Sequence, residues 1–150
     1  MKQVIVHLLQ HLKPGGIESL ALEFQRAAQP LFDVHIISLE KHNVKCYWNN
    51  IDGFEEFIHV LNKKPGWQMN IFSQLTAFFK KVKPIYVHTH HIGPLIYGGV
   101  AKANFDNIVF SDVSALLPVN SLLMLDSHFK NPKVGAVSGG YKFIQKGTAG

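Results

Sequence analysis

The chain has 150 residues, 47% hydrophobic and 17% charged, and a formal net charge of +5 from 15 Lys+Arg against 10 Asp+Glu. This length suits one domain with its own core and excludes two domains of ordinary size. The excess of positive charge favours anionic partners such as phosphates and nucleotides. A basic surface that is merely solvated is an equally good interpretation. We expect no nucleic-acid partner, because the chain has no RRM, KH or zinc-finger signature.

The single cysteine, Cys46, excludes an internal disulfide and a zinc site built from several thiolates. This fits a reducing compartment, and a cytoplasmic location is the default expectation. No stretch approaches 18 uninterrupted apolar residues, so we expect no membrane span, and any membrane contact would be peripheral, at the inner face.

Strand and helix patterns alternate along the chain. Apolar, β-rich runs predict strands at residues 3–9, 32–39, 56–61, 85–90 and 107–110, and periodic apolar positions predict helices at 17–28, 68–82, 95–103 and 118–129. Parallel strands need long crossovers, which helices supply. The order therefore predicts an α/β fold: a Rossmann-like, doubly wound, mainly parallel sheet with flanking helices and a loosely packed C-terminal part.

Gly15 and Gly16 follow the first predicted strand and precede the first predicted helix. Without side chains they let a ligand approach the backbone, and the helix N-terminus favours an anion there. The pattern is neither GxGxxG nor a Walker lysine motif. A tight turn without a ligand is the alternative interpretation.

Three histidines, His88, His90 and His91, cluster at the end of the predicted strand 85–90. The carboxyl ends of strands line the ligand crevice of open α/β sheets. Strand alternation predicts His88 and His90 on one face and His91 on the other. One of them could hydrogen-bond a sugar or phosphate oxygen, and a pair of structural histidines is an equal alternative. A metal site would need a third ligand from elsewhere.

Asp112 also follows an apolar strand, residues 107–110. A carboxylate at that position can hold a divalent cation that neutralises a diphosphate, if other ligands help. The alternative is a helix cap or an Asx turn. The run Asp126-Ser127-His128 has the residue types of a hydrolase triad, but consecutive helical positions cannot form that relay.

Four short motifs in the first two thirds of the chain carry a family resemblance. They are Gly-Gly-Ile-Glu at 15–18, Lys-Pro-Gly-Trp at 64–67, the run from Lys-Pro to Gly-Pro-Leu at 83–95, and Tyr-Gly-Gly at 97–99. On these, residues from about 1 to 103 resemble the N-terminal domain of family 4 glycosyltransferases, which have the GT-B fold. The resemblance implies that Gly15 and Gly16 lie near the donor phosphate and the acceptor, that His90 is the catalytic histidine beside the transferred sugar, and that His91 binds substrate.

Residues from about 105 to 145 carry a second resemblance, through the runs at 108–118 and 129–140. They resemble an internal segment of family 2 glycosyltransferases, which have the GT-A fold. The resemblance implies that Asp112 is the first acidic residue of a metal and nucleotide motif. Ser114 stands at the second acidic position, which weakens the metal site.

Both parts resemble enzymes that use nucleotide sugars, yet each is incomplete. We infer a fusion of two fragments, 1–104 and 105–150, with the junction near residues 103–105, and we do not expect the catalytic apparatus of either family to be assembled. The expected function is related to hexosyltransferases: transfer of a sugar from a nucleotide-sugar donor to a saccharide or lipid-linked acceptor. The alternative is a non-catalytic α/β module that binds an anionic ligand or a partner protein and self-associates through an exposed cleft face.

Overall fold

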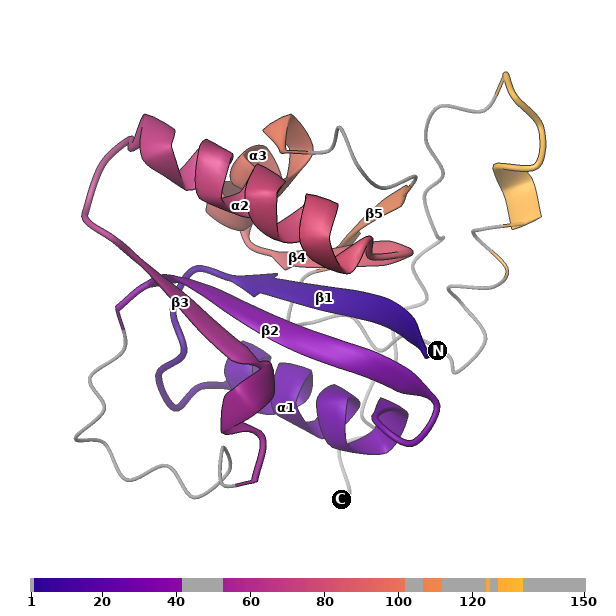
Figure 1. Cartoon of the computed structure of the whole chain (residues 1–150), viewed down its shortest axis with the longest axis horizontal. Coiled ribbons are helices and arrows are strands. Elements are labelled where there is room, and N and C mark those ends of the chain that lie inside the picture. The colour runs from indigo at the N-terminus through magenta and orange to yellow at the C-terminus, as the bar shows by residue number, and fades with distance from the viewer. Residues whose placement is uncertain (1, 42–52, 102–106, 112–123, 125–126, 134–150) are drawn as a thin grey trace, which may run out of the picture. The chain divides into compact units, whose positions relative to one another are not determined.

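The computed structural model describes residues 2–41, 53–101, 107–111, 124 and 127–133. Strands and helices alternate along the chain (Figure 1). In order they are β1 (Gln3–Leu9), α1 (Gly16–Ala28), β2 (Phe32–Glu40), the 3-10 helix η2 (Glu55–Phe57), β3 (Ile58–Lys63), α2 (Met69–Val82), β4 (Tyr86–His90), α3 (Ile92–Val100) and β5 (Asn107–Ser111). The predicted α/β, Rossmann-like class is confirmed.

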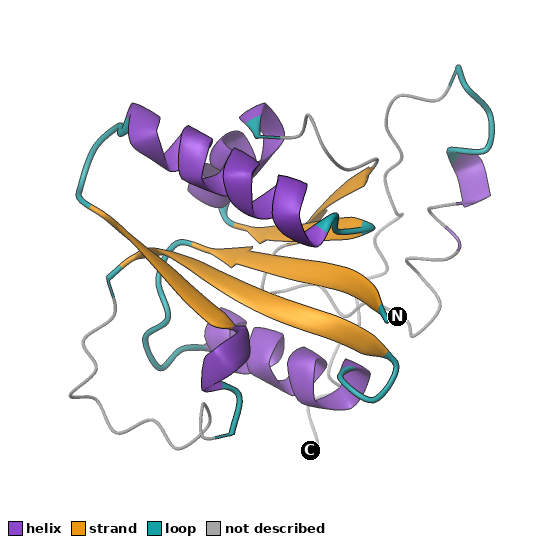
Figure 2. Cartoon of the chain, viewed as in Figure 1, coloured by secondary structure: helices purple, strands orange, loops and turns teal. Residues whose placement is uncertain are grey.

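The five strands form one sheet in the order β3-β2-β1-β4-β5, and every neighbouring pair is parallel (Figure 2). β1 is central: Ile5 lies opposite Val34 of β2 on one side and Tyr86 of β4 on the other. The chain moves outward from β1 through β2 to β3, and then returns past β1 to add β4 and β5. This is the doubly wound order that the alternation of elements predicted.

Helix α1 covers one face of the sheet. It packs an apolar stripe against β1, β2 and the loop after β1, with the buried residues Leu9, Leu12, Ile17, Ala21, Leu22 and Ile36. The helical positions in this stripe recur at the spacing of one helix face. Gln25 is buried beside them and its Nε2 donates to the Val34 carbonyl at 2.9 Å, so a polar contact also ties α1 to β2.

Helices α2 and α3 cover the opposite face. The buried core on this side consists of Val6, Leu8, Ile37, Leu39, Ile71, Leu75, Phe79, Val87, Tyr97 and Ala101. Helix α2 ends where Lys83 adopts a left-handed φ of 49° and its N–H donates to the Phe79 carbonyl at 2.8 Å. Pro84 follows and cannot continue the helix, which ends at the predicted residue 82.

Helix α3 begins at Ile92, earlier than the predicted start at residue 95. Pro94 falls in its first turn. The prediction placed the helix after this proline, but the first N–H groups of a helix have no partner within the helix, so a proline there removes no hydrogen bond.

The chain divides by its internal contacts into Met1–Ser114 and Ala115–Gly150. β5 follows the predicted junction at 103–105 and pairs with β4; the junction itself stays a prediction about ancestry. In the second unit the Ser127 hydroxyl donates to the Met124 carbonyl at 2.6 Å. Most of the predicted helix 118–129 lies outside the described residues. Among those described, no helix has the length and apolar character needed to cross a membrane.

Candidate functional site

The carboxyl ends of β1 and β4 form the switch point of the sheet. From β1 the chain turns to α1 on one face, and from β4 it turns to α3 on the other. Connections that diverge from adjacent parallel strands open a crevice outside the strand ends, where open α/β sheets bind their ligands. Three predicted site residues lie at this edge: Gly15, Gly16 and His91.

Gly15 is the N-cap of α1, with an extended backbone and no side-chain cap. The Glu18 carboxylate folds back so closely over this residue that a Cβ at Gly15 would collide with Oε2. Oε1 of the same carboxylate lies 3.1 Å from His11 Nδ1, although this contact lacks hydrogen-bond alignment. A carboxylate therefore already occupies the positive end of this helix dipole.

The N-terminus of α3 is different. His91 is its N-cap, exposed and in a left-handed conformation with φ 74°, and it makes no side-chain cap. No acidic residue lies in the first turn. A Cβ at Gly93 would lie 2.6 Å from Gln10 Oε1, so the start of α3 lies close to the Gln10 side chain in the loop after β1.

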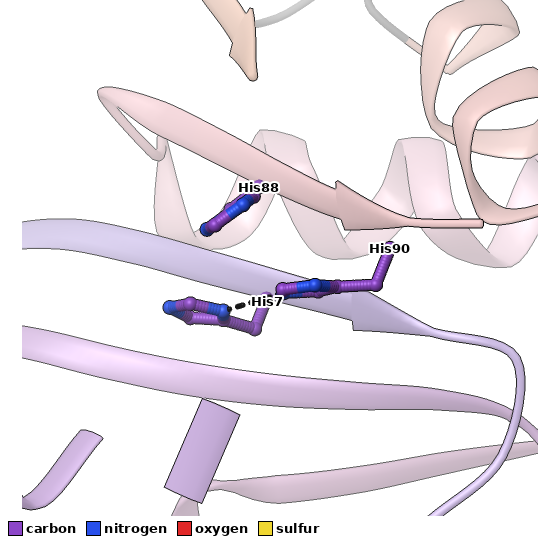
Figure 3. Close-up of side chains that lie close together, drawn as sticks. All are labelled: His7, His88 and His90. Atoms are coloured by element: carbon purple, nitrogen blue, oxygen red, sulfur yellow. Dashed lines mark hydrogen bonds between the residues drawn. The ribbon is translucent and has the colours of Figure 1, made fainter. Parts of the chain in front are cut away.

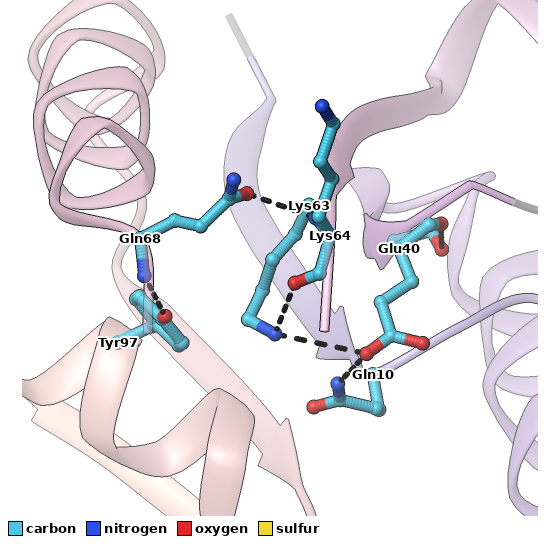
Figure 4. A network of polar contacts seen from close by, with 7 residues as sticks. Gln10, Glu40, Lys63, Lys64, Gln68 and Tyr97 are labelled. Carbon is cyan, nitrogen blue, oxygen red and sulfur yellow. Dashed lines mark hydrogen bonds and ion pairs between the residues drawn. The ribbon is translucent and has the colours of Figure 1, made fainter. Parts of the chain in front are cut away.

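A polar network joins the ends of β1, β2 and β3 (Figure 4). Gln10 Nε2 donates to Glu40 Oε1, and Lys63 Nζ lies 3.7 Å from the same oxygen. Lys63 is buried, donates to the Lys64 carbonyl at 3.0 Å, and places its ammonium 5.8 Å from the centre of the Tyr97 ring. This network was not predicted from the sequence. The sequence pattern that could have indicated it is a polar residue at the end of each of the three strands or immediately after it.

The Lys-Pro-Gly-Trp motif forms the loop from β3 to α2 at the same edge. The Gln68 N–H donates to the Tyr97 hydroxyl at 3.0 Å, and Gln68 Oε1 accepts from the Lys64 N–H at 2.9 Å (Figure 4). Gly66 has a φ of 86°, which favours glycine. These contacts hold the loop against α3.

Three histidines from β1 and β4 lie together on the face of the sheet that α1 covers (Figure 3). His7 Nδ1 is 3.1 Å from His90 Nε2, within hydrogen-bond distance. The His88 ring centre is 4.9 Å from that of His7 and 4.2 Å from that of His90. One ring nitrogen from each residue lies within 4.8 Å of the other two. We call these residues the three-histidine cluster.

Burial keeps this cluster uncharged. His7, His88 and His90 are 1%, 6% and 1% exposed. Burial lowers the pKa of His88 to about 4; for His90, burial together with repulsion from His88 and His91 lowers the pKa to about 3. The pKa of His7 is also well below its ordinary value, because of burial and the two neighbouring imidazoles. Each ring at neutral pH therefore has one N–H and one nitrogen with a lone pair, and His7 Nε2 is buried without a hydrogen-bond partner.

A second group, the histidine pair, lies on the opposite face against α2. His35 Nδ1 is 3.0 Å from His59 Nε2, and both rings contact Phe78. The two side chains are half-buried. Burial lowers the pKa of His35 while Asp33 opposes the shift; the pKa of His59 is lowered by burial, by His35 and by Lys81.

The structure separates the predicted histidines. His88 and His90 share a face, as predicted; His91 has left the strand and lies exposed at the start of α3. His90, the predicted catalytic residue, faces His7 rather than the exposed edge. The sequence prediction missed His7, which lies directly opposite His88 in the β1–β4 register. Asp112, the predicted metal ligand, lies outside the described residues.

The fold and the position of this edge define a Rossmann-like α/β protein. No family model matches the chain, and none of the curated proteins matches it. Among solved structures, the crystal structure of UDP-N-acetylglucosamine 2-epimerase is similar, with a TM-score of 0.51 and 19% sequence identity. The match covers 83% of this chain but 35% of that chain, and at this identity it shows the fold alone.

Proposed function

We propose that the chain binds the phosphates of a nucleotide sugar at the carboxyl edge of β1 and β4, and serves as one half of an enzyme that transfers the sugar. One observation carries the proposal: β1 and β4 pair at the switch point, and the helices that follow them both begin without a side-chain cap. The free N–H groups at such helix ends suit a phosphate.

The start of α3 is the better phosphate site of the two. Glu18 places a negative charge over the start of α1, whereas the first turn of α3 has no acidic residue and His91 is exposed beside it. Lysines at or after the ends of three strands add long-range attraction for an anion. They are Lys13 after β1, Lys41 after β2, and Lys63 and Lys64 at and after the end of β3.

The two adjacent histidines take different roles in this proposal. His91 is exposed, so it contacts the ligand directly in the conformation described. His90 acts as the catalytic contact to the transferred sugar only after its ring turns away from His7. Gly15 and Gly16 leave space for the acceptor beside that sugar.

The similarity to UDP-N-acetylglucosamine 2-epimerase supports a sugar nucleotide as the ligand class. The chain spans 35% of that protein's length, so a comparable enzyme would have further protein around the ligand. Stabilisation of the departing diphosphate is the main catalytic requirement in sugar transfer, and it needs donors aimed at the leaving group from all sides. We therefore expect this chain alone to bind the donor without transferring the sugar.

Thermal unfolding of the whole chain with UDP-, GDP- and ADP-sugars tests the proposal, because a ligand of the folded state raises the unfolding temperature. We expect at least one nucleotide sugar to raise it. The double variant K13Q/K64Q should weaken this shift. K80Q/K81Q removes the same charge from the far end of α2 and should leave the shift unchanged. No shift with any nucleotide sugar at millimolar concentration, or an equal loss in both variants, would overturn the proposal.

A partner-binding module is the second candidate, and exposed apolar side chains favour it. Trp67, Met69, Ile92 and Val100 are 68%, 77%, 69% and 64% exposed, and all belong to α3 or to the beginning of α2 and its preceding loop. Light scattering over a range of concentrations should then show self-association that W67S/M69S reduces. A wild-type monomer at every concentration argues against this function.

A further inference from the structure

We propose that His7, His88 and His90 bind a divalent transition-metal ion such as Zn²⁺ in the interior of the sheet. The three imidazoles lie close together, and one ring nitrogen from each lies within 4.8 Å of the other two. This inference does not depend on phosphate binding at the start of α3, but it shares His90 with the proposed contact to the transferred sugar, and metal bound to His90 would hold that ring inside the sheet.

The spacing of the ring nitrogens is close to that of a metal site. Zn–N bonds of about 2.0–2.1 Å in tetrahedral geometry place two ligand nitrogens roughly 3.3 Å apart. His7 Nδ1 and His90 Nε2 are 3.1 Å apart. One ring nitrogen from each of the three residues lies within 4.8 Å of the other two.

The backbone holds the three residues in register. His7 lies directly opposite His88 on adjacent parallel strands, and His90 is two residues further along β4 on the same face. The Phe24 ring of α1 packs on His7 with ring centres 4.7 Å apart. Ligands that project from paired strands are positioned more accurately than ligands on loops.

The donor set selects the class of metal. Neutral imidazole nitrogens suit Zn²⁺, Co²⁺, Ni²⁺ and Cu²⁺, whereas Mg²⁺ and Ca²⁺ require oxygen ligands. Among the residues that the structure describes, no carboxylate joins the three rings. His7 Nε2 has no hydrogen-bond partner, so the rings do not satisfy one another fully. Three histidines leave a fourth position for water.

Metal bound here would cross-link β1 to β4. These strands carry the two halves of the sheet, and metal that binds only the folded state adds its binding free energy to stability. In the conformation described the three rings are buried, so a bound ion would lie away from the exposed edge, and its expected role is to stabilise the fold.

Reconstitution of the whole chain tests this site. The protein is unfolded in denaturant with EDTA, transferred to metal-free denaturant, and refolded with Zn²⁺ or Co²⁺ alone, because a buried site needs access during folding. We expect one metal ion per chain after gel filtration, a visible absorption band typical of four-coordinate Co²⁺, and a higher unfolding temperature than after metal-free refolding. H88Q and H90Q should each lose the retained metal, and the matched control H35Q/H59Q should keep it.

A second measurement does not depend on the folding of variants. Zinc-edge X-ray absorption of the reconstituted wild-type protein should show three imidazole nitrogens at about 2.0–2.1 Å. Absence of stoichiometric metal in the refolded wild-type protein would overturn the proposal. So would loss of metal in H35Q/H59Q with retention in H88Q, or a zinc shell without imidazole.

Discussion

The three-histidine cluster and the histidine pair lie on opposite faces of the same sheet and differ mainly in burial. The cluster combines His7 with His88 and His90 in the interior, while His35 and His59 retain access to water. Burial lowers the pKa in both groups, and in the cluster the neighbouring imidazoles lower the pKa of His7 and His90 further. The histidine side chain is thus neutral at physiological pH in the buried cluster, whereas in the half-buried pair its pKa is shifted less.

The largest predicted effect is a loss of stability in acid. In metal-free protein this loss should come mainly from the three-histidine cluster. Unfolded histidine has a pKa of about 6.5 and folded His88 a pKa of about 4, so between these values the unfolded state binds a proton that the folded state does not. The free energy of unfolding should therefore fall as the pH drops below about 6.5, by about 3 kcal/mol at pH 4 for His88 alone. Urea unfolding in EDTA across this range measures the fall.

The double variant H35Q/H59Q serves as the control for this acid effect. It should keep most of the loss, because His35 and His59 are less buried than the cluster. A variant as stable at pH 4 as at pH 7 would show that the pair, and not the cluster, produces the acid sensitivity.

A smaller loss of stability is expected at neutral pH when one histidine of a contacting pair is replaced. His90→Leu leaves Nδ1 of the buried His7 without its hydrogen bond, which should cost about 1–3 kcal/mol of stability. His59→Leu removes the matching partner of His35, but water can replace it at this half-buried site, so the cost should stay below about 1 kcal/mol. Chemical unfolding at pH 7 compares the two variants, and equal losses would contradict the contrast in burial.

The aromatic ring that packs on the histidine pair allows a third test of the contrast between the two groups. Phe78 contacts both His35 and His59, so Phe78→Leu should lower the free energy of unfolding by about 1 kcal/mol. The acid-induced loss attributed to the cluster should keep its size, because this ring lies on the opposite face. A reduced acid effect in the variant would mean that the two groups are coupled through the sheet.

The smallest predicted effect follows from removing a single charge near the histidine pair. Lys81 lowers the pKa of His59, so Lys81→Gln should raise that pKa. An NMR titration of the histidine ring signals resolves the shift at His59. The signals of His7 and His88 should not respond, and a shift of either would contradict the separation of the two faces.

Local patterns were sufficient to predict most of the fold. Period-2 and helical spacing predicted nearly every described element, and the predicted end of α2 at residue 82 is confirmed. The predicted start of α3 at residue 95 is too late, because Pro94 lies in the first turn of the helix, where a proline is tolerated.

The candidate sites were harder to predict because they depend on which strands are neighbours. Alternation along one strand correctly placed His88 with His90, yet it could not bring in His7, since the pairing of β1 with β4 is a property of the whole sheet. The contact between Gln10 and Glu40 was missed for the same reason. Spacing also gave no sign that His90 would face inward while His91 lies exposed.

The central place of β1 also has a consequence for the order of folding. His7 and His90 are 83 residues apart in sequence, so their contact cannot form until β4 has been synthesised and docked beside the first strand. Contacts of such long range slow folding, because the loop must close before they contribute any stabilisation. The rings of His7 and His90 would therefore report the moment at which the two halves of the sheet join, which a histidine-specific NMR or quenching probe could follow in time.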